Sequence, residues 1–304
     1  MAIRRTLAIS VISLVSGCGI SHKDSRSLRR MPDSRLSALA GVLDYQIGPS
    51  WGKTIVTQDS LQSQSPAFQR AAKATARVRL GFGGATAFVI GEKNGQVILA
   101  TNHHVIGEDS DCSGAKISFE MLNISNLKCD KIINTNTDLD LTIFTVTGAS
   151  AEQKETLMAV AKTFDDGETQ KGTKLLTIGY GVAGNSGQKN LMSGQDEDCK
   201  TYSADGEVRY MADPDEFNPG PYKTWMFATG CDVSHGDSGS AIVDRETGNV
   251  VGILSTGKIP KNAVVREQSY LSKIFSESSE DVWKELTYAV PASKIRELVG
   301  DDLP

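Results

Sequence analysis

Residues 236–240, Gly-Asp-Ser-Gly-Ser, form the segment that most restricts the local fold of this chain. Two glycines flank Ser238 in a run too open for a helix and too tightly turned for a strand. We expect a sharp turn that exposes the Ser238 hydroxyl and points the backbone N–H groups of Gly236 and Ser238 outward. Such a hydroxyl can attack a carbonyl carbon, and the N–H groups can hold the oxyanion that forms. Because Gly-Ser-Gly also occurs in plain turns, this chemistry requires a base and an acid elsewhere in the chain.

Candidates for both groups lie upstream. The chain has four histidines, and two of them, His103 and His104, follow a strand-like run at 96–100. Asp138 and Asp140 begin an apolar, β-branched run, which is typical of a strand that enters a core with a carboxylate at its mouth. The order along the chain is therefore histidine, aspartate, serine.

This order and its motifs resemble the chymotrypsin-like (trypsin-like) serine proteases, especially their bacterial branch. Residues 101–105 resemble the family's histidine motif, 140–143 its aspartate motif and 236–240 its serine motif. The resemblance covers about 75–300 and ends in a helix at 292–299. It implies an all-β fold of two six-stranded antiparallel barrels, with a C-terminal helix and a catalytic cleft where the barrels meet.

The resemblance also implies a serine endopeptidase that acts on protein or peptide substrates. His104, Asp140 and Ser238 would form its catalytic triad, and the amides of Gly236 and Ser238 its oxyanion hole. This chemistry needs no metal or organic cofactor, and no second cluster has metal-ligand spacing. The competing hypothesis is a catalytically silent relative that binds peptides or partner proteins through the same groove.

Each role has an alternative. Asp140 is favoured over Asp138 because the residues after Asp140 match the motif better, and Asp138 is then a solvated acid at a strand end. His104 is the expected base and His103 a structural histidine. Asp237 is expected to brace the oxyanion loop, but no activation motif lies upstream that would create an N-terminal ammonium to pair with it.

The resemblance makes one prediction about specificity. The residue six positions before the serine often forms the floor of the primary pocket, and here it is Asp232, which would select Arg or Lys. The alternative is that Asp232 caps a turn after Cys231. Ser255 and Gly257 would bind substrate backbone as an added strand, and His235 lies near the pocket rim or is only a surface residue.

The N-terminus predicts export. A basic start is followed by a short apolar run at 7–15, too short to cross a membrane, and then by Val-Ser-Gly-Cys at 15–18, which resembles a bacterial lipobox. Lipidation of Cys18 would anchor the protein to a bacterial membrane, with the outer membrane or periplasm expected and secretion as second choice. An ordinary signal peptide with a chance cysteine is the alternative.

Once Cys18 is set aside, four cysteines remain, which suits an oxidising compartment. These four cysteines can pair in three ways, and we favour the one that joins Cys112 to Cys129 and Cys199 to Cys231. Zinc ligation is the alternative. A net charge of −5 does not suggest nucleic-acid binding, and we expect a monomer.

The expected organisation follows from these segments. The predicted parts are a signal peptide at 1–17, a lipidated tether at 18–74 and a protease domain at 75–304, with its first barrel at about 75–150, its second at about 170–290 and its helix at about 291–300. The strand-like runs are 76–80, 85–90, 96–100, 115–119 and 141–146 in the first barrel and 174–179, 207–211, 223–229, 241–243 and 250–255 in the second. A helix at 151–162 would link them, and 213–221 and 259–281 would be surface loops.

Overall fold

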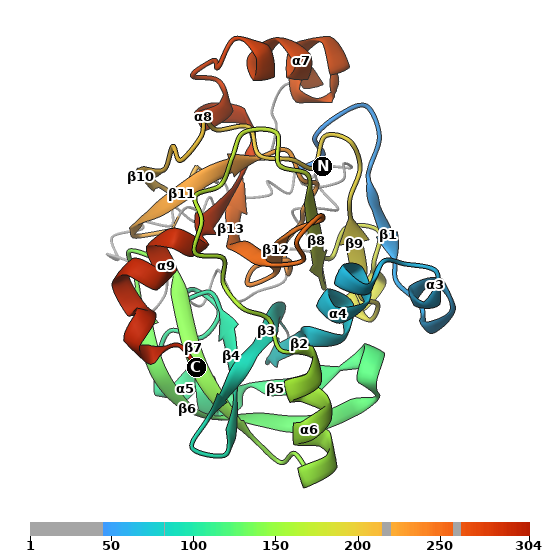
Figure 1. The fold of residues 1–304 in the computed structure, drawn as a ribbon, viewed down its shortest axis with the longest axis vertical. Helices are drawn as coiled ribbons and strands as arrows, with labels where there is room; N and C mark the ends of the chain where they lie inside the picture. The colour runs from blue at the N-terminus through green and yellow to red at the C-terminus, as the bar shows by residue number, and fades with distance from the viewer. Residues whose placement is uncertain (1–44, 82, 215–219, 258–262) are drawn as a thin grey trace, which may run out of the picture.

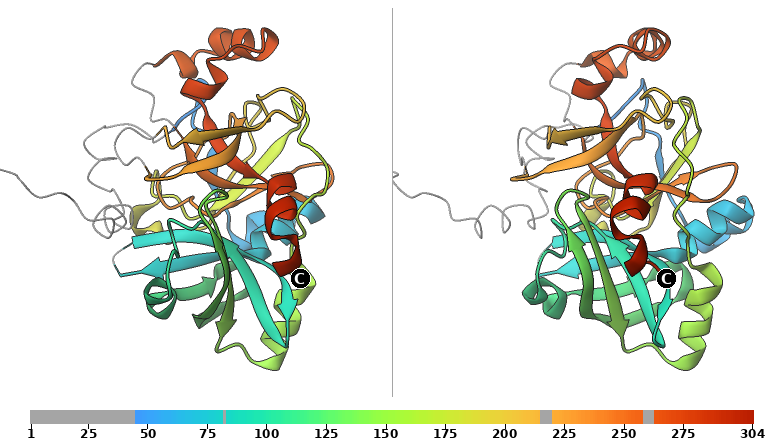
Figure 2. Two further views of the ribbon diagram at one scale, coloured as in Figure 1. Left: turned by 90° about the vertical axis from the view of Figure 1, so that its left-hand side faces the viewer. Right: turned by 60° about the vertical axis from the view of Figure 1, so that its left-hand side comes forward.

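The computed structural model describes residues 45–304 except 82, 215–219 and 258–262 (Figure 1). The expected signal peptide, Cys18 and the first part of the predicted tether lie outside the described residues. Two β-structures lie one above the other in Figure 1, and the C-terminal helix α9 (Ala292–Val299) runs beside both of them, as the turned views in Figure 2 also show.

The lower structure is the expected closed, antiparallel six-stranded barrel, in the order β2-β3-β4-β7-β6-β5. Its strands are β2 (Thr75–Leu80), β3 (Gly83–Lys93), β4 (Gln96–Thr101), β5 (Lys116–Phe119), β6 (Ile124–Asn136) and β7 (Leu141–Thr147). The sequence motifs did not predict β6. Its buried residues do not alternate regularly, and its pairing with β7 shifts register twice, so it lacks the period-two pattern of a half-buried strand.

The upper structure corrects the expectation of a second closed barrel. It is an open eight-stranded sheet in the order β1-β9-β8-β12-β13-β14-β11-β10. Its strands are β1 (Lys53–Ile55), β8 (Leu175–Gly179), β9 (Met192–Gly194), β10 (Arg209–Ala212), β11 (Lys223–Thr229), β12 (Ala241–Asp244), β13 (Val250–Gly257) and β14 (Thr287–Pro291). The sheet is open because, among the described strands, β1 pairs only with β9 and β10 only with β11.

The edge strand β1 belongs to a segment that we expected to be part of the tether. Residues 45–74 instead pack on the domain and contain two helices, α3 (Gln58–Gln62) and α4 (Pro66–Ala74). Ser65 caps α4 by accepting a hydrogen bond from the Phe68 amide, and a proline occupies the first turn, where no N–H partner is needed. Phe68 is buried in a core cluster with residues from both β-structures. The folded part of the chain therefore begins well before residue 75.

The other helices of the described residues cover the outside of the two β-structures. They are α5 (Asp109–Gly114), α6 (Ala151–Val160), α7 (Gln268–Ser276) and α8 (Val282–Glu285), with short 3-10 turns at Glu120–Leu122, Ser186–Gln188, Ala263–Arg266 and Gly300–Asp302. The predicted linking helix is α6, and the predicted closing helix is α9. The expected surface loop at 259–281 contains α7, whose Leu271 and Ile274 are buried.

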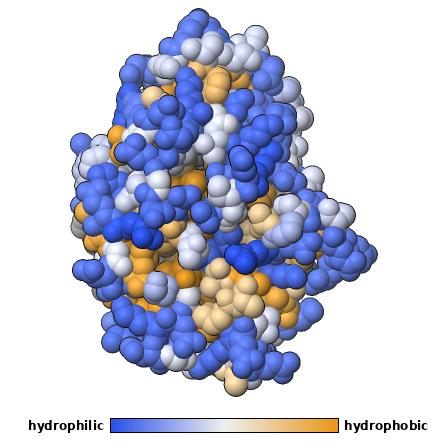
Figure 3. Space-filling model, viewed as in Figure 1, coloured by the Kyte–Doolittle hydropathy of each residue, from blue (hydrophilic) through white to orange (hydrophobic). Residues whose placement is uncertain are grey.

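One core cluster joins the two β-structures. It contains Phe88 and Ile143 of the barrel, Ile253 of the sheet and Ile295 of α9, all fully buried. The face seen in Figure 3 is largely hydrophilic, and its apolar side chains gather mainly over the lower, barrel half. Because the shared core fixes one β-structure against the other, loops from both can meet at a site with a defined geometry.

Candidate active site

His104 and Asp140 meet because the strands that carry them are neighbours. His104 follows the end of β4, Asp140 immediately precedes β7, and the two strands pair antiparallel. The His104 Nδ1 atom lies 2.7 Å from Asp140 Oδ2, and the His104 backbone N–H donates to Asp140 Oδ1 at 3.0 Å. The two contacts hold the imidazole in one orientation and leave its Nε2 directed away from Asp140.

The backbone of Asp140 adopts an uncommon conformation, with φ +42°. Non-glycine residues at positive φ cost of the order of 1 kcal/mol or more and persist where surrounding contacts hold them. Two donors supply those contacts, because the Asn102 side-chain amide and the His103 backbone N–H each donate to the Asp140 carbonyl oxygen at 2.9 Å. Residues next to His104 therefore stabilise the backbone conformation of Asp140.

Ser255, predicted to bind substrate backbone, also contacts the Asp140 carboxylate. The Ser255 hydroxyl donates to Asp140 Oδ2 at 2.7 Å, the oxygen that contacts His104. Ser255 is buried in β13 and sits at a register shift between Leu254 and Thr256. From the sequence, Ser255 is expected only to bind substrate backbone, so its contact with Asp140 is an additional role.

Asp138 and His103 lie in other environments. Asp138 is exposed, and its carboxylate accepts a hydrogen bond from the Tyr210 hydroxyl at 2.7 Å. His103 is buried, with its Nδ1 2.7 Å from the Thr135 hydroxyl and its ring edge-on to Tyr222. Of the two aspartates considered, Asp140 is therefore the one placed beside His104.

The 236–240 loop precedes β12 and turns sharply, with φ +96° at Gly236 and +84° at Gly239. Thr86 of the barrel binds this loop across the junction, since its N–H donates to the Ser238 carbonyl and its hydroxyl to the Gly236 carbonyl, both at 2.9 Å. A Cβ at Gly239 would overlap the Thr86 carbonyl oxygen. The approach is therefore close enough to require glycine.

Two polar groups of this loop lack partners. Among the residues that the structure describes, neither the Gly236 nor the Ser238 N–H donates a hydrogen bond, and no hydrogen bond joins the Ser238 hydroxyl to His104. Ser238 is half-buried, whereas Gly236, Asp237 and Gly239 are buried. The loop thus offers two free N–H donors next to an accessible hydroxyl.

Asp237, whose partner the sequence left open, contacts a residue far away in the chain. Its Oδ1 lies 2.5 Å from Lys53 Nζ of β1, and both side chains are almost fully buried. The same carboxylate accepts hydrogen bonds from the Gly181 N–H at 3.1 Å and the Ser234 N–H at 2.8 Å. No motif in the sequence pointed to Lys53.

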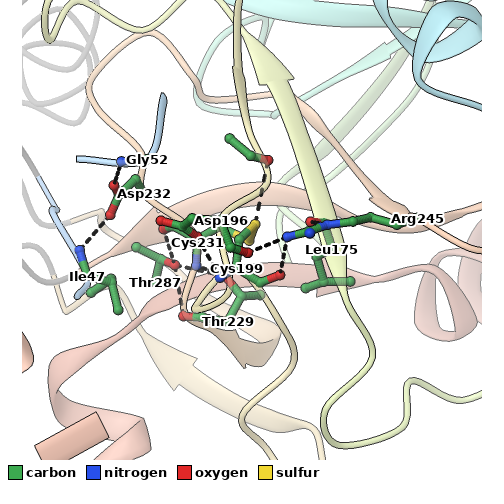
Figure 4. Close-up of a disulfide and its surroundings, with 11 residues drawn as sticks. Ile47, Gly52, Leu175, Asp196, Cys199, Thr229, Cys231, Asp232, Arg245 and Thr287 are labelled. Carbon is green, nitrogen blue, oxygen red and sulfur yellow. Dashed lines mark hydrogen bonds between the residues drawn. A yellow bond between two sulfur atoms is a disulfide. The ribbon is translucent and has the colours of Figure 1, made fainter. Parts of the chain in front are cut away.

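Asp232 does not face an open pocket. It is 1% exposed, and its two carboxylate oxygens accept hydrogen bonds from the backbone N–H groups of Ile47 (2.6 Å) and Gly52 (2.5 Å), as Figure 4 shows. Burial raises the pKa of Asp232 to about 7, while these two hydrogen bonds act in the opposite direction. In this structure both oxygens are already used, so Asp232 is not free to bind an Arg or Lys side chain.

The other predicted substrate-binding residues lie beside the same N-terminal segment. A Cβ on Gly257 would stand 2.9 Å from the Tyr45 ring. The Tyr45 ring also packs edge-on against His235, with 5.9 Å between the ring centroids. Tyr45 is itself buried, so it covers this side of the predicted binding region.

The structure contains the two disulfides that we favoured, Cys112–Cys129 and Cys199–Cys231. The second lies next to Asp232, and Arg245 donates to the Leu175 and Cys199 carbonyl oxygens around it (Figure 4). Within the described part of the chain, no cluster of three or more His, Cys, Asp or Glu residues could hold a metal ion. The described helices include none that is long and apolar enough to span a membrane.

Comparison with known proteins points to one family. A sequence model of the trypsin-like peptidase domain matches residues 85–253, whereas no curated protein sequence matches the chain.

Similar solved structures include two of Rv3671c in an inactive form. One, a serine-to-alanine mutant from M. tuberculosis H37Rv, has 16% identity and a TM-score of 0.51 over 82% of this chain and 95% of that chain. The other, described as the Rv3671c protease, has 15% identity and a TM-score of 0.51 over 82% and 98%. At this identity the likeness concerns the fold alone.

Proposed function

This chain belongs to the trypsin-like peptidase domain family, and on that premise we propose that it is a serine endopeptidase with His104, Asp140 and Ser238 as its triad. The observation that carries the proposal is the 2.7 Å contact between His104 Nδ1 and Asp140 Oδ2. It holds the tautomer that keeps the proton on Nδ1 and leaves the Nε2 lone pair to act as a base.

The proposed reaction proceeds through an acyl-enzyme. His104 Nε2 takes the Ser238 hydroxyl proton as Oγ attacks the peptide carbonyl carbon, and Asp140 stabilises the imidazolium that forms. The free N–H groups of Gly236 and Ser238 bind the tetrahedral oxyanion. His104 then gives its proton to the leaving amine, and water, activated by the same histidine, hydrolyses the ester. Removing one oxyanion donor typically costs about 2.7–4 kcal/mol of barrier.

Labelling of the full-length protein with a fluorophosphonate tests this proposal. The wild type should be labelled on Ser238 and should hydrolyse casein, whereas Ser238→Ala should lose the label and roughly 10⁶-fold of kcat. A folded wild type that neither reacts with the probe nor cleaves casein would exclude serine peptidase activity.

The alternative is a catalytically silent protein that binds peptides or partner proteins. Two observations favour it: no hydrogen bond joins Ser238 to His104 among the described residues, and Tyr45 covers the Gly257 side of the predicted groove. Catalytic hydrogen bonds are often long before substrate binds, which keeps the enzyme as the first proposal. Peptide binding without labelling would favour the alternative.

A preference for Arg or Lys before the cleaved bond requires the segment at 47–52 to leave Asp232. Cleavage-site profiling of the wild type and of Asp232→Ser tests it. If the preference for Arg or Lys disappears in Asp232→Ser, Asp232 is the determinant of specificity. If the preference is unchanged, Asp232 does not determine it.

We also propose that Cys18 is lipidated and anchors the protein outside the cytoplasm. The two disulfides support an oxidising compartment. Metabolic labelling with a fatty acid should mark the wild type and not Cys18→Ser. Equal labelling of both proteins would contradict the anchor.

A further inference from the structure

The buried ion pair between Lys53 and Asp237 joins parts of the chain 184 positions apart. Their side chains are 1% and 0% exposed, so water does not compensate either charge. A buried charge is costly unless it is paired and hydrogen-bonded. Of the cationic side chains that the structure describes, Lys53 alone forms an ion pair with Asp237.

The position of Asp237 gives this pair its importance. Asp237 stands between Gly236 and Ser238, whose N–H groups form the proposed oxyanion hole. Its carboxylate is also enclosed by the Gly181 and Ser234 backbone, because a Cβ on Gly181 would overlap both the Asp237 carboxylate and the Ser234 hydroxyl. The Asp237 carboxylate is therefore held tightly by the backbone around it, directly between the two amides of the proposed oxyanion hole.

Lys53 is itself held in place by its own segment. In β1 it pairs with Gly194 of β9, and a Cβ on Gly194 would lie 3.3 Å from the Lys53 side chain. On one side of Lys53, the Ile47 and Gly52 N–H groups bind Asp232, and on the other, the Val56 N–H donates to the Leu191 carbonyl. The ammonium thus reaches Asp237 from a backbone that is fixed on both sides.

We propose that Lys53 is a positioning residue of the serine peptidase suggested above, acting through Asp237 on the Gly236 and Ser238 amides. This inference rests on the proposed function. Because the cation is a side chain within the chain, the order of the serine loop does not depend on an amino terminus created by cleavage. A chain that still carries the residues before Lys53 is therefore competent for catalysis.

The test compares Lys53→Met with Lys162→Met in the full-length protein. Lys162 is the other buried lysine among the described residues; its ammonium donates to the Gly248 carbonyl, and it contacts none of the site residues. With a peptide ester substrate, Lys53→Met should lower kcat at least 100-fold and change KM less than about threefold, as expected for loss of oxyanion donors. Lys162→Met should stay within twofold of the wild type.

A second variant separates positioning from folding. Lys53→Met leaves a lone buried carboxylate and can fail to fold, whereas Lys53→Met combined with Asp237→Asn removes both charges. The double variant should fold, as circular dichroism will show, and should still label with fluorophosphonate at least 100-fold more slowly than the wild type. Wild-type labelling by the folded double variant would overturn the inference.

Intact-mass analysis of the labelled wild type completes the test. The label should be found on chains that retain residues upstream of Lys53, and a label confined to chains cleaved after Lys53 would overturn the inference. If the wild type is not labelled at all, the proposed function fails instead, so the two failures are distinguishable.

Discussion

Ser255 and His104 contact the same oxygen of Asp140, although Ser255 lies in the sheet and the other two residues belong to the barrel. The Ser255 hydroxyl and His104 Nδ1 are each 2.7 Å from Asp140 Oδ2. The carboxylate is thus oriented by both β-structures at once, so its position depends on how they pack together.

Replacing Ser255 by alanine should therefore weaken catalysis without abolishing it. The change removes one hydrogen bond to a charged group, for which about 1.5 kcal/mol is a typical contribution, and kcat should fall about tenfold with little change in KM. Steady-state kinetics of Ser255→Ala will measure this. Ser203→Ala is the control, because Ser203 is buried and none of the hydrogen bonds described for the structure joins it to the site. Equal kinetics of the two variants would contradict the role of Ser255.

The two aspartates near the histidine provide a matched comparison. Asp140→Asn should lower kcat roughly 10⁴-fold, because the amide favours the wrong tautomer of His104. Asp138→Asn should leave kcat within about twofold of the wild type. Asp138 is exposed, and among the described residues its side chain is hydrogen-bonded only to Tyr210. Reversed effects of the two substitutions would reassign the acid of the triad.

The raised pKa of Asp232 predicts a pH-dependent stability. Burial raises this pKa from 3.8 to about 7. The unfolded chain therefore loses this proton at a lower pH than the folded protein does. The protonated Asp232 carboxyl adds to the free energy of unfolding in full below about pH 4, and this contribution is lost as the pH rises through about 7. The difference corresponds to roughly 4 kcal/mol at about 1.4 kcal/mol per pH unit.

Urea unfolding of the wild type and of Asp232→Asn between pH 4 and 8 will measure this difference. The wild type should lose stability relative to the variant as the pH rises. Parallel curves for the two proteins would show that Asp232 does not titrate in this range.

The two disulfides should differ in their effect on activity. Replacing both cysteines of Cys199–Cys231 by alanine should lower the free energy of unfolding by about 3–4 kcal/mol, and the shorter Cys112–Cys129 loop should cost roughly 3 kcal/mol. Because Cys231 adjoins Asp232, replacing Cys199 and Cys231 should also lower kcat at temperatures below the melting temperature of the variant. Thermal unfolding and kinetics of both double variants test this, and equal activities would contradict it.

Local residue pattern was enough to predict the barrel strands that carry regular apolar residues, such as β4 and β7, because a strand with a buried face repeats every two residues. It was not enough for β6, whose bulges break that repeat, or for β1, three residues whose place in the sheet depends on pairing with β9. The closure of the second sheet also lay beyond local pattern, since it depends on whether the two edge strands meet.

Neighbouring residues are enough to identify the groups that can do chemistry here: a serine between glycines, a histidine after a strand and an aspartate before one. The groups that support them come together only in the folded chain. Lys53 reaches Asp237 across 184 positions, and Ser255 reaches Asp140 across 115. The reason is physical: a turn or strand depends on nearby residues, whereas the partner of a buried charge is whichever distant group the packed chain places beside it.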